Sequence, residues 1–291
     1  MLTAILIGLS LGCVYGLVGI GFSVVNRTTR VVNFMQGSFV MLSSMTATWL
    51  LQSFQVPYLL AILAGLAVCV IVGALVALVI VRPLWERRAA HFVFLIAMLV
   101  IISIIENVAM HWFGTTPKDM PSWNQTASVS IFSAQVSPQY IWILSLSVVL
   151  VVCFRLFLNH TMLGRAMRAC AIDRETSSLL GISPQMIALL AFLLAGLLGG
   201  LAGIMIAPVR FTVYNGGLSY GLKGFVAGVV GGLSSIEGAL VGGLLIGLLE
   251  AFAGLYLPTS YQDVIVFALL LFVIFLRPHG IIKGPGGGAW S

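Results

Sequence analysis

Long apolar runs follow one another along almost the whole chain, and they constrain the fold more than any other feature of the sequence. A helix that crosses a bilayer needs about 20 predominantly apolar residues. On this basis we predict about nine spans, with approximate bounds Ala4–Val25, Phe34–Leu51, Pro57–Val81, Phe92–Trp112, Tyr140–Phe157, Ser183–Ile206, Leu218–Leu233, Ala239–Leu257 and Tyr261–Leu276. The sequence therefore predicts an all-α, polytopic transmembrane helix bundle of eight or nine spans, with residues 1–283 forming a single domain.

The scarcity of charge supports a membrane protein. Only 8% of the 291 residues are charged, whereas soluble domains carry about 25%. So few charges cannot cover a water-facing surface, so lipid is the expected surrounding. The net charge of +6 is spread over short segments between the apolar runs, so we do not expect nucleic acid as a partner.

The seventh apolar run, Leu218–Leu233, differs from the others. It is short and rich in glycine, and it contains Lys223. It is either a full span or a broken, re-entrant helix, which a membrane tolerates only where protein or a water-filled cavity covers it. The sequence leaves both alternatives open.

Lysine and arginine are distributed unevenly between the loops. If the turn with Arg27 and Arg30 is cytoplasmic, alternation brings ten of the 14 basic residues to the cytoplasmic side, and only Lys118 and Arg210 lie outside. Basic loops remain in the cytoplasm during insertion. We therefore predict a multi-pass inner-membrane protein with an external N-terminus and a cytoplasmic C-terminus, provided that the seventh run crosses fully.

Three segments are predicted to lie outside the bilayer. The periplasmic loop 113–139 contains an alternating stretch from Ser128 to Ser133 that is typical of a small strand pair. A cytoplasmic loop covers 159–183, and a flexible tail covers 284–291.

The cytoplasmic loop is predicted to form one helix from about Thr161 to Leu180, ended by Gly181. Three- and four-residue spacing would align one face of this helix, made of Arg165, Arg168, Ala169, Ile172, Thr176 and Leu179. Such a helix fits a groove on a soluble partner. A solvated basic connector is an equally good interpretation of the spacing alone.

Sequence blocks in the same order as in one known family extend over nearly the whole chain. They are TRVVNFMQGSF at 29–39, RPL at 82–84, IIEN at 104–107, GRAMRACAID at 164–173, GLKGFVAGVVGGLSSIEGALVGGLLIGLLE at 221–250 and RPHGI at 277–281. With these blocks the chain resembles the permease subunits of high-affinity branched-chain amino acid ABC importers.

The resemblance implies a permease of an ATP-driven importer that moves branched-chain amino acids or a related small solute delivered by a periplasmic binding protein. It further implies a second permease subunit, homologous or identical, and two cytoplasmic ATPase subunits. ATP and Mg would bind to those ATPases, and this chain would hold no cofactor. The positions that correspond to the family's coupling loop are Gly164, Arg165, Ala166, Arg168, Ala169 and Gly181.

Polar residues inside the predicted spans are candidates for the translocation pathway, because such residues are expensive in lipid and usually face the bundle interior or water. These candidates are Asn33, Gln36 with the adjacent Gly37, Glu106, Asn107, Lys223 and Glu250. Each could instead bridge two helices by hydrogen bonds. Lys223 could also be the counter-charge of an acidic group or extend toward an interface.

Glycines recur at four-residue intervals, a pattern that indicates close helix crossings in membranes. Examples are Gly8/Gly12/Gly16, Gly224/Gly228/Gly232 and Gly243/Gly247.

Enzyme and metal functions find no support in the sequence. It contains no GxxxxGK[ST] phosphate loop. The four histidines lie in separate segments without the spacing of metal ligands: His91, His111, His160 and His279. We therefore expect neither an enzyme nor a metal site. The alternatives to an ABC permease are an ion-coupled secondary transporter and a channel-like subunit without energy coupling, and co-purification of ATPase subunits would discriminate between them.

Overall fold

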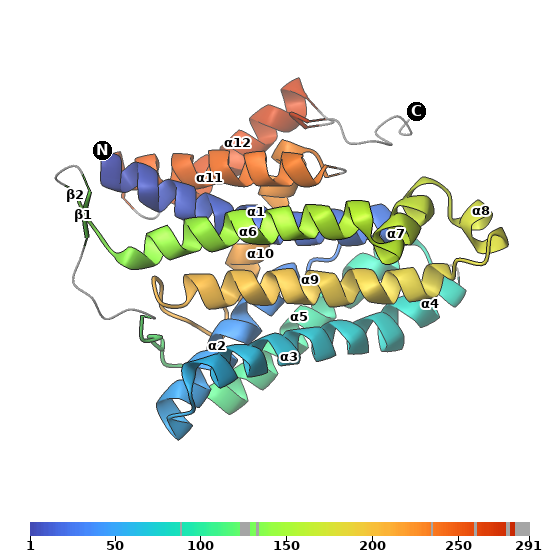
Figure 1. Ribbon diagram of the computed structural model, residues 1–291, viewed down its shortest axis with the longest axis horizontal. Helices are drawn as coiled ribbons and strands as arrows, with labels where there is room; N and C mark the ends of the chain where they lie inside the picture. The colour runs from blue at the N-terminus through green and yellow to red at the C-terminus, as the bar shows by residue number, and fades with distance from the viewer. Residues whose placement is uncertain are drawn as a thin grey trace.

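The computed structural model describes residues 1–87, 89–122, 129–131, 134–233, 235–258, 261–277 and 280–282. Helices occupy each predicted apolar run, which confirms the all-α membrane bundle (Figure 1). These helices are α1 (Leu2–Thr29), α2 (Gln36–Phe54), α3 (Tyr58–Val76), α5 (His91–Phe113), α6 (Pro138–His160), α9 (Pro184–Ile206), α10 (Gly217–Gly231), α11 (Ile236–Tyr256) and α12 (Gln262–Leu276).

Helix α3 continues without a loop through a wider turn, η1 (Ala77–Val81), into the short α4 (Arg82–Glu86). Pro83 has no N–H for the α-helical bond to the carbonyl of Val79, and a π-helical turn is a common way to absorb such a defect. The structure thus makes one rod of the third predicted span and the basic segment that follows it.

Length and hydropathy alone qualify 6 of the described helices as membrane spans, counting α3 to α4 as one. They are α1, α3–α4, α5, α6, α9 and α11. Helices α10 and α12 have only 15 residues each, and α2 is rich in serine and threonine. The predicted number of eight or nine spans is therefore approximate.

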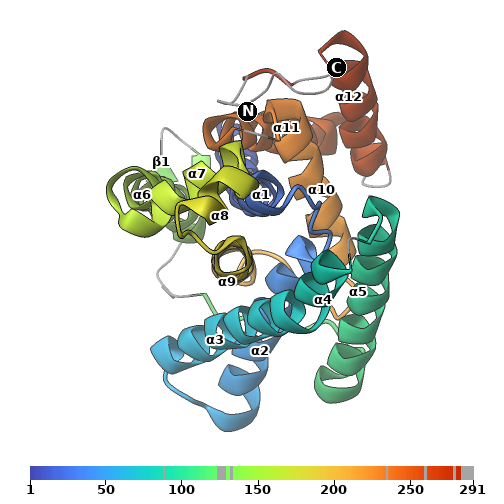
Figure 2. The ribbon, with the colours of Figure 1, turned by 90° about the vertical axis from the view of Figure 1, so that its right-hand side faces the viewer.

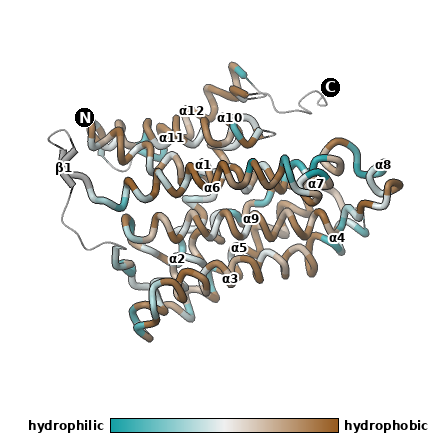
Figure 3. Tube along the Cα trace, in the orientation of Figure 1, coloured by the Kyte–Doolittle hydropathy of each residue, from teal (hydrophilic) through white to brown (hydrophobic). Residues whose placement is uncertain are grey.

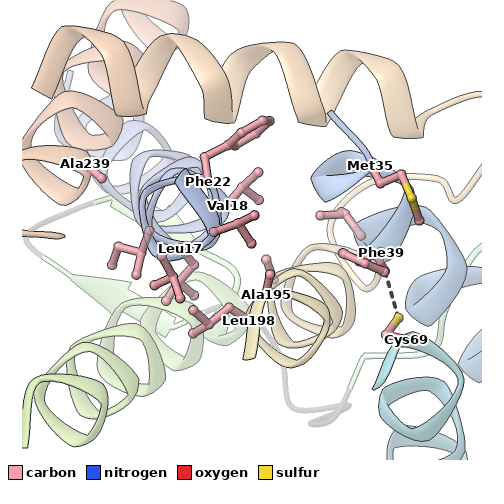
Figure 4. Packing of buried hydrophobic residues seen from close by; sticks show 14 of the residues in the cluster. Leu17, Val18, Phe22, Met35, Phe39, Cys69, Ala195, Leu198 and Ala239 are labelled. Atoms are coloured by element: carbon pink, nitrogen blue, oxygen red, sulfur yellow. Dashed lines mark hydrogen bonds between the residues drawn. The ribbon is translucent and has the colours of Figure 1, made fainter. Parts of the chain in front are cut away.

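Helix α1 is the centre of the bundle. It packs against α11, α9, α10 and α6, and Figure 4 shows Leu17, Val18 and Phe22 of α1 between Ala195 and Leu198 of α9 on one side and the helices of the C-terminal part on the other. Polar and small residues are tolerated in this first span because protein, not lipid, surrounds it.

The remaining helices extend from this centre. Helix α9 also packs against α2 and α3, where the Cys69 Sγ donates to the Phe39 carbonyl oxygen over 3.1 Å. Figure 2 shows α5 and α12 at the margin of the bundle, on either side of α10. Most residues of the outer helices are hydrophobic (Figure 3), and many of their large apolar side chains are exposed, as expected of a surface that faces hydrocarbon.

The two ends of the bundle differ in charge. At one end a bridge pairs Lys118 with Thr212, two residues from Arg210, so both predicted outer basic residues lie together. The predicted strand pair is confirmed at this same end as β1 (Val129–Ile131) and β2 (Ala134–Val136), antiparallel (Figure 1). The opposite end holds α4 and the segment after α6.

The single helix predicted for the segment after α6 is wrong. The structure has two helices, α7 (Met162–Ile172) and α8 (Arg174–Leu179), separated by Asp173 in an extended conformation. The Asp173 carboxylate accepts bonds from the N–H groups of Glu175 and Thr176, so it caps a new helix and cannot continue the old one. Gly181 follows with a φ of 84° and stops α8, as predicted.

Some predicted features lie outside the described residues. They are the tail 284–291, parts of the outer loop at 123–128 and 132–133, and, among the basic residues, Arg88 and Lys283.

Candidate functional site

A buried non-helical segment and the first turn of α2 together contain the first group of predicted pathway residues. Helix α1 ends at Thr29, the following Arg30 turns the chain with a φ of 53°, and α2 begins only at Gln36. Asn33 and Gln36 are both 0% exposed. Irregular backbone at this depth is tolerated because α1, α9 and α10 cover it.

The polar atoms of this segment are only partly satisfied. Asn33 Oδ1 accepts the N–H of Met35 over 3.2 Å, and Gln36 Nε2 donates to the carbonyl oxygen of Ala195 on α9 over 2.9 Å. Asn33 Nδ2, Gln36 Oε1 and Ser38 Oγ have no hydrogen-bond partner in the part of the chain that the structure describes. A buried polar group without a partner costs about 1–3 kcal/mol, so three together call for an explanation.

Gly37 brings α2 and α10 into direct backbone contact. A Cβ atom at Gly37 would overlap the carbonyl oxygen of Gly217 and would lie 2.5 Å from the amide nitrogen of Gly221. Only glycine allows this approach. The predicted pathway segment therefore lies against the start of the short α10.

A second buried site joins Lys223 and Glu250, which the sequence presented as separate candidates. Lys223 Nζ and Arg210 Nη2 each lie 3.0 Å from Glu250 Oε1, and the Tyr15 hydroxyl donates to Glu250 Oε2 over 2.7 Å. Lys223 Nζ also lies 2.9 Å from Asp263 Oδ1. We call these five residues the Glu250 cluster.

The Glu250 cluster is neutral overall and ties together α1, α10, α11, α12 and the loop after α9. The side chains of Glu250 and Lys223 are only 2% and 7% exposed, whereas those of Arg210 and Asp263 reach the surface. Lys223 is therefore the counter-charge of an acidic group, Glu250, and does not extend toward an interface. Sequence analysis missed Tyr15, Arg210 and Asp263, and Arg210 had appeared only as an outer-loop charge.

Glu106 and Asn107 lie apart from both sites, on the peripheral helix α5. Glu106 is half-buried, and the exposed Asn107 donates to the carbonyl oxygen of Ser103 on its own helix over 2.7 Å. Among the described residues, no hydrogen bond or ion pair joins either of them to the Glu250 cluster.

The predicted coupling residues divide into structural and exposed ones. Gly164 is buried, and a Cβ there would overlap Leu158 at the end of α6. Arg168 donates from Nη1 to the carbonyl oxygen of Leu158 and, over 2.8 Å, to Asn159 Oδ1, so it holds the corner between α6 and α7. Arg165 is exposed, and its Nη2 donates to the Met162 sulfur over 2.9 Å.

The other three predicted coupling residues are Ala166, Ala169 and Gly181. Ala166 and Ala169 are half-buried on α7, and Gly181 is exposed beyond α8.

Large apolar side chains gather on the exposed surface of α7 and α8. We call Met162, Ile172, Leu179 and Leu180 the α7–α8 patch, and their exposed fractions are 74%, 79%, 88% and 75%. Both helices lie beyond the helices that qualify as membrane spans. Large apolar side chains so exposed outside the spans indicate an interaction site.

Asp173 is held ionised at the junction of the two helices. Hydrogen bonds from the Thr176 hydroxyl and then from the backbone lower the pKa of its carboxyl group, so the α8 cap is retained at neutral pH and lost only as the pH falls through that lowered pKa.

The exterior is apolar, polar and charged groups are buried within the bundle, and an apolar patch lies beyond the spans. Together these features indicate an integral membrane protein of the transport-permease class. The pattern of the family described as "Branched-chain amino acid transport system / permease component" matches residues 4–274, and the chain belongs to this family. This is a family of transmembrane transport permeases and not a class of enzymes.

Individual relatives agree with this assignment. The chain is 31% identical to the high-affinity branched-chain amino acid transport system permease protein LivH of Salmonella typhimurium and 32% identical to the corresponding protein BraD of Pseudomonas aeruginosa. Each match covers 96% of this chain and 94% of the relative. The ribose import permease protein RbsC of Escherichia coli is 27% identical over 90% of this chain and 81% of its own length. No solved structure matches the chain.

Proposed function

We propose that this chain is the permease subunit of an ATP-driven importer that carries branched-chain amino acids or a related small solute across the bacterial inner membrane. The solute would be delivered by a periplasmic binding protein. The α7–α8 patch is the observation that carries the proposal, because apolar side chains so exposed beyond the spanning helices need a protein partner.

The partner on the α7–α8 patch would be an ATPase subunit, one of two that bind ATP and Mg, so that this chain itself needs no cofactor. A second permease, homologous or identical, would complete the membrane part. The loop 159–183 would then be cytoplasmic and the loop 113–139 periplasmic, with the N-terminus outside and the C-terminus inside. The concentration of Arg30, Arg82, Arg165 and Arg174 at the α7–α8 end supports this orientation.

The buried segment around Gln36 is the best candidate for part of the translocation pathway. An importer alternates between states, and polar atoms without partners in one state gain water or solute in another. Asn33, Gln36 and Ser38 offer such atoms beside the Gly37 crossing. Glu106 and Asn107 would border the pathway only where the second permease covers α5.

A secondary transporter driven by an ion gradient has less support. It needs carboxylates in the core that can bind and release the coupling ion. Glu250 is instead neutralised by Lys223 and Arg210 within the Glu250 cluster.

Replacing Ile172 and Leu179 together by serine is expected to abolish coupling and leave the permease intact. Neither side chain packs against the described part of the chain, so membrane insertion and melting temperature should not change. The loss of two apolar anchors should weaken ATPase binding by about tenfold or more. The measurement is co-purification of ATPase subunits together with solute uptake; wild-type retention and uptake would overturn the docking surface.

Reversing charge at Arg165 and at Arg168 separates recognition from structure. Arg165→Glu should leave the fold intact and uncouple ATP hydrolysis from uptake, because Arg165 is exposed. Arg168→Glu should also lower the melting temperature, because it removes the bonds to Leu158 and Asn159. Comparing ATPase activity, uptake and thermal unfolding of the two variants tests this difference, and normal transport by the double variant would refute the coupling role.

A further inference from the structure

Three polar residues lie together on the outward side of the peripheral helix α5. Ser103, Glu106 and Asn107 follow one another at three- and four-residue spacing, so they share one face of the helix, and we call them the α5 strip. Ser103 and Asn107 are exposed and Glu106 is half-buried. Among the described elements α5 packs mainly against α2, and Figure 2 shows it at the margin of the bundle. The α5 strip is therefore open to whatever surrounds the chain.

The α5 strip lies at the depth of the hydrocarbon. Trp112 follows six residues after Glu106 near the end of α5 and is 73% exposed, and exposed tryptophan is typical of the membrane interface. With a rise of about 1.5 Å per residue, Glu106 lies about 9 Å farther into the bilayer. Helical side chains lean toward the N-terminus of their helix, which for α5 is the opposite end of the bundle. The Glu106 carboxylate therefore points away from the headgroups near Trp112.

The Glu106 carboxylate has no partner at this depth. No hydrogen bond or ion pair joins it to another residue that the structure describes, whereas Ser103 and Asn107 each donate to a carbonyl oxygen of α5 itself. An ionisable group inside a span is costly unless protein or water meets it. Acyl chains carry no hydrogen-bond donor, so lipid does not satisfy this face. A protein helix that carries a donor does.

The neighbouring helix α10 needs protein on the same side. It has 15 residues, which make about 22 Å of helix, whereas the hydrocarbon core is about 30 Å thick. A helix that stops short of the interface leaves end groups that lipid cannot hydrogen-bond. Leu218 and Ser219 near its start are exposed, and Figure 2 shows α10 between α5 and α12. Two independent features thus require a protein partner along this margin of the bundle.

We propose that the α5 strip is the surface that contacts the second permease subunit, and that a transmembrane helix of this subunit places a hydrogen-bond donor against Glu106. The inference rests on the proposed function, from which the second permease is taken. The Asn107 amide uses only one of its two N–H groups within α5. An identical second subunit in a two-fold arrangement would therefore offer its own copy of this amide as the donor, and a homologous subunit would need an equivalent group.

The test measures association in liposomes, by energy transfer between the fluorescently labelled chain and a labelled second permease at increasing lipid dilution. The second permease is a copy of this chain or a homologous permease expressed with it. Glu106→Leu should weaken association about tenfold, because it removes the acceptor of a hydrogen bond between helices. Glu106→Gln keeps an acceptor oxygen and should retain most of the affinity.

Added bulk tests the same surface independently. Ser103→Trp should hold the two subunits apart and weaken association by at least about tenfold. Ser145→Trp on α6 is the matched control, because Ser145 is also exposed and its hydroxyl also donates to a carbonyl oxygen of its own helix. Figure 2 shows α6 on the side of the bundle away from α5. Both substitutions are exposed in the single chain, so both variants should insert and melt like the wild type.

The outcomes separate the two proposals. If neither a copy of this chain nor a homologous permease associates with the wild type, the second permease of the proposed function is wrong, and this inference is wrong with it. If the wild type associates and Glu106→Leu, Ser103→Trp and Ser145→Trp do so equally well, the contact on α5 is wrong and the proposed function stands. If only Ser145→Trp weakens association, the contact lies on α6, which also overturns the inference.

Discussion

Gly247→Leu is expected to prevent accumulation of folded protein in the membrane. Gly8 and Gly12 of α1 face Gly243 and Gly247 of α11 with backbone against backbone, and even a Cβ atom at Gly247 would overlap the Gly12 amide nitrogen and the Gly8 carbonyl oxygen. Backbone atoms cannot move aside as a flexible side chain can. The expected penalty therefore exceeds the ~1–3 kcal/mol typical of overpacking.

Gly228→Ala is the matched control for this variant. A Cβ at Gly228 would have its nearest neighbours at 3.5 Å, on the Leu233 side chain, and at 3.6 Å, on the Gly19 carbonyl oxygen, which are ordinary contacts. Its yield after detergent extraction and its elution on size exclusion should match the wild type, while Gly247→Leu should be lost or aggregated. Equal yields of the two variants would show that α1 and α11 cross less closely at Gly247 than the structure indicates.

Glu250→Ala is expected to be the most damaging change at a charged position. It leaves the buried Lys223 with Asp263 as its carboxylate among the described residues and removes the ion pair of Arg210 with Glu250. Breaking a buried ion pair from one side costs about 3–5 kcal/mol. In a chain of this size the apparent melting temperature should fall by roughly 10 °C or more, which thermal unfolding in detergent can measure.

Removing the opposite charge as well should restore much of this loss. In the double variant Glu250→Ala with Lys223→Met no buried charge remains, because Arg210 and Asp263 are 38% and 60% exposed and can be hydrated. A double-mutant cycle that shows additive losses for the two substitutions would contradict a direct pairing of Lys223 with Glu250.

The positions of the helices were predictable because each span must bury its own backbone bonds and present apolar side chains to lipid. The apolar runs that show this lie in continuous stretches of sequence, so each helix can be predicted from its own residues. The corner at Asp173 was not predicted, because the spacing of Arg165, Arg168 and Leu179 fits one helix as well as two. Capping decides between them, and a single aspartate shows its capping role only when its carboxylate geometry is known.

The candidate site was predictable as a set of residue types and not as an arrangement. Lys223 and Glu250 stand out in the sequence because charges are rare in spans, but their pairing depends on the packing of α10 against α11. Arg210 follows α9 and resembled any loop arginine. Gly228 and Gly247 share one spacing, yet only the structure separates a close crossing from a loose one.

The central place of α1 has a consequence for biosynthesis. This helix leaves the ribosome long before α9, α10 and α11, which enclose it and follow much later in the chain. Until they arrive, the glycine seam of α1 and the hydroxyl of Tyr15 must be sheltered by the insertion machinery or by lipid. A nascent chain truncated before α9 would thus expose α1 without its packing partners to membrane proteases, even if each of its segments had inserted correctly.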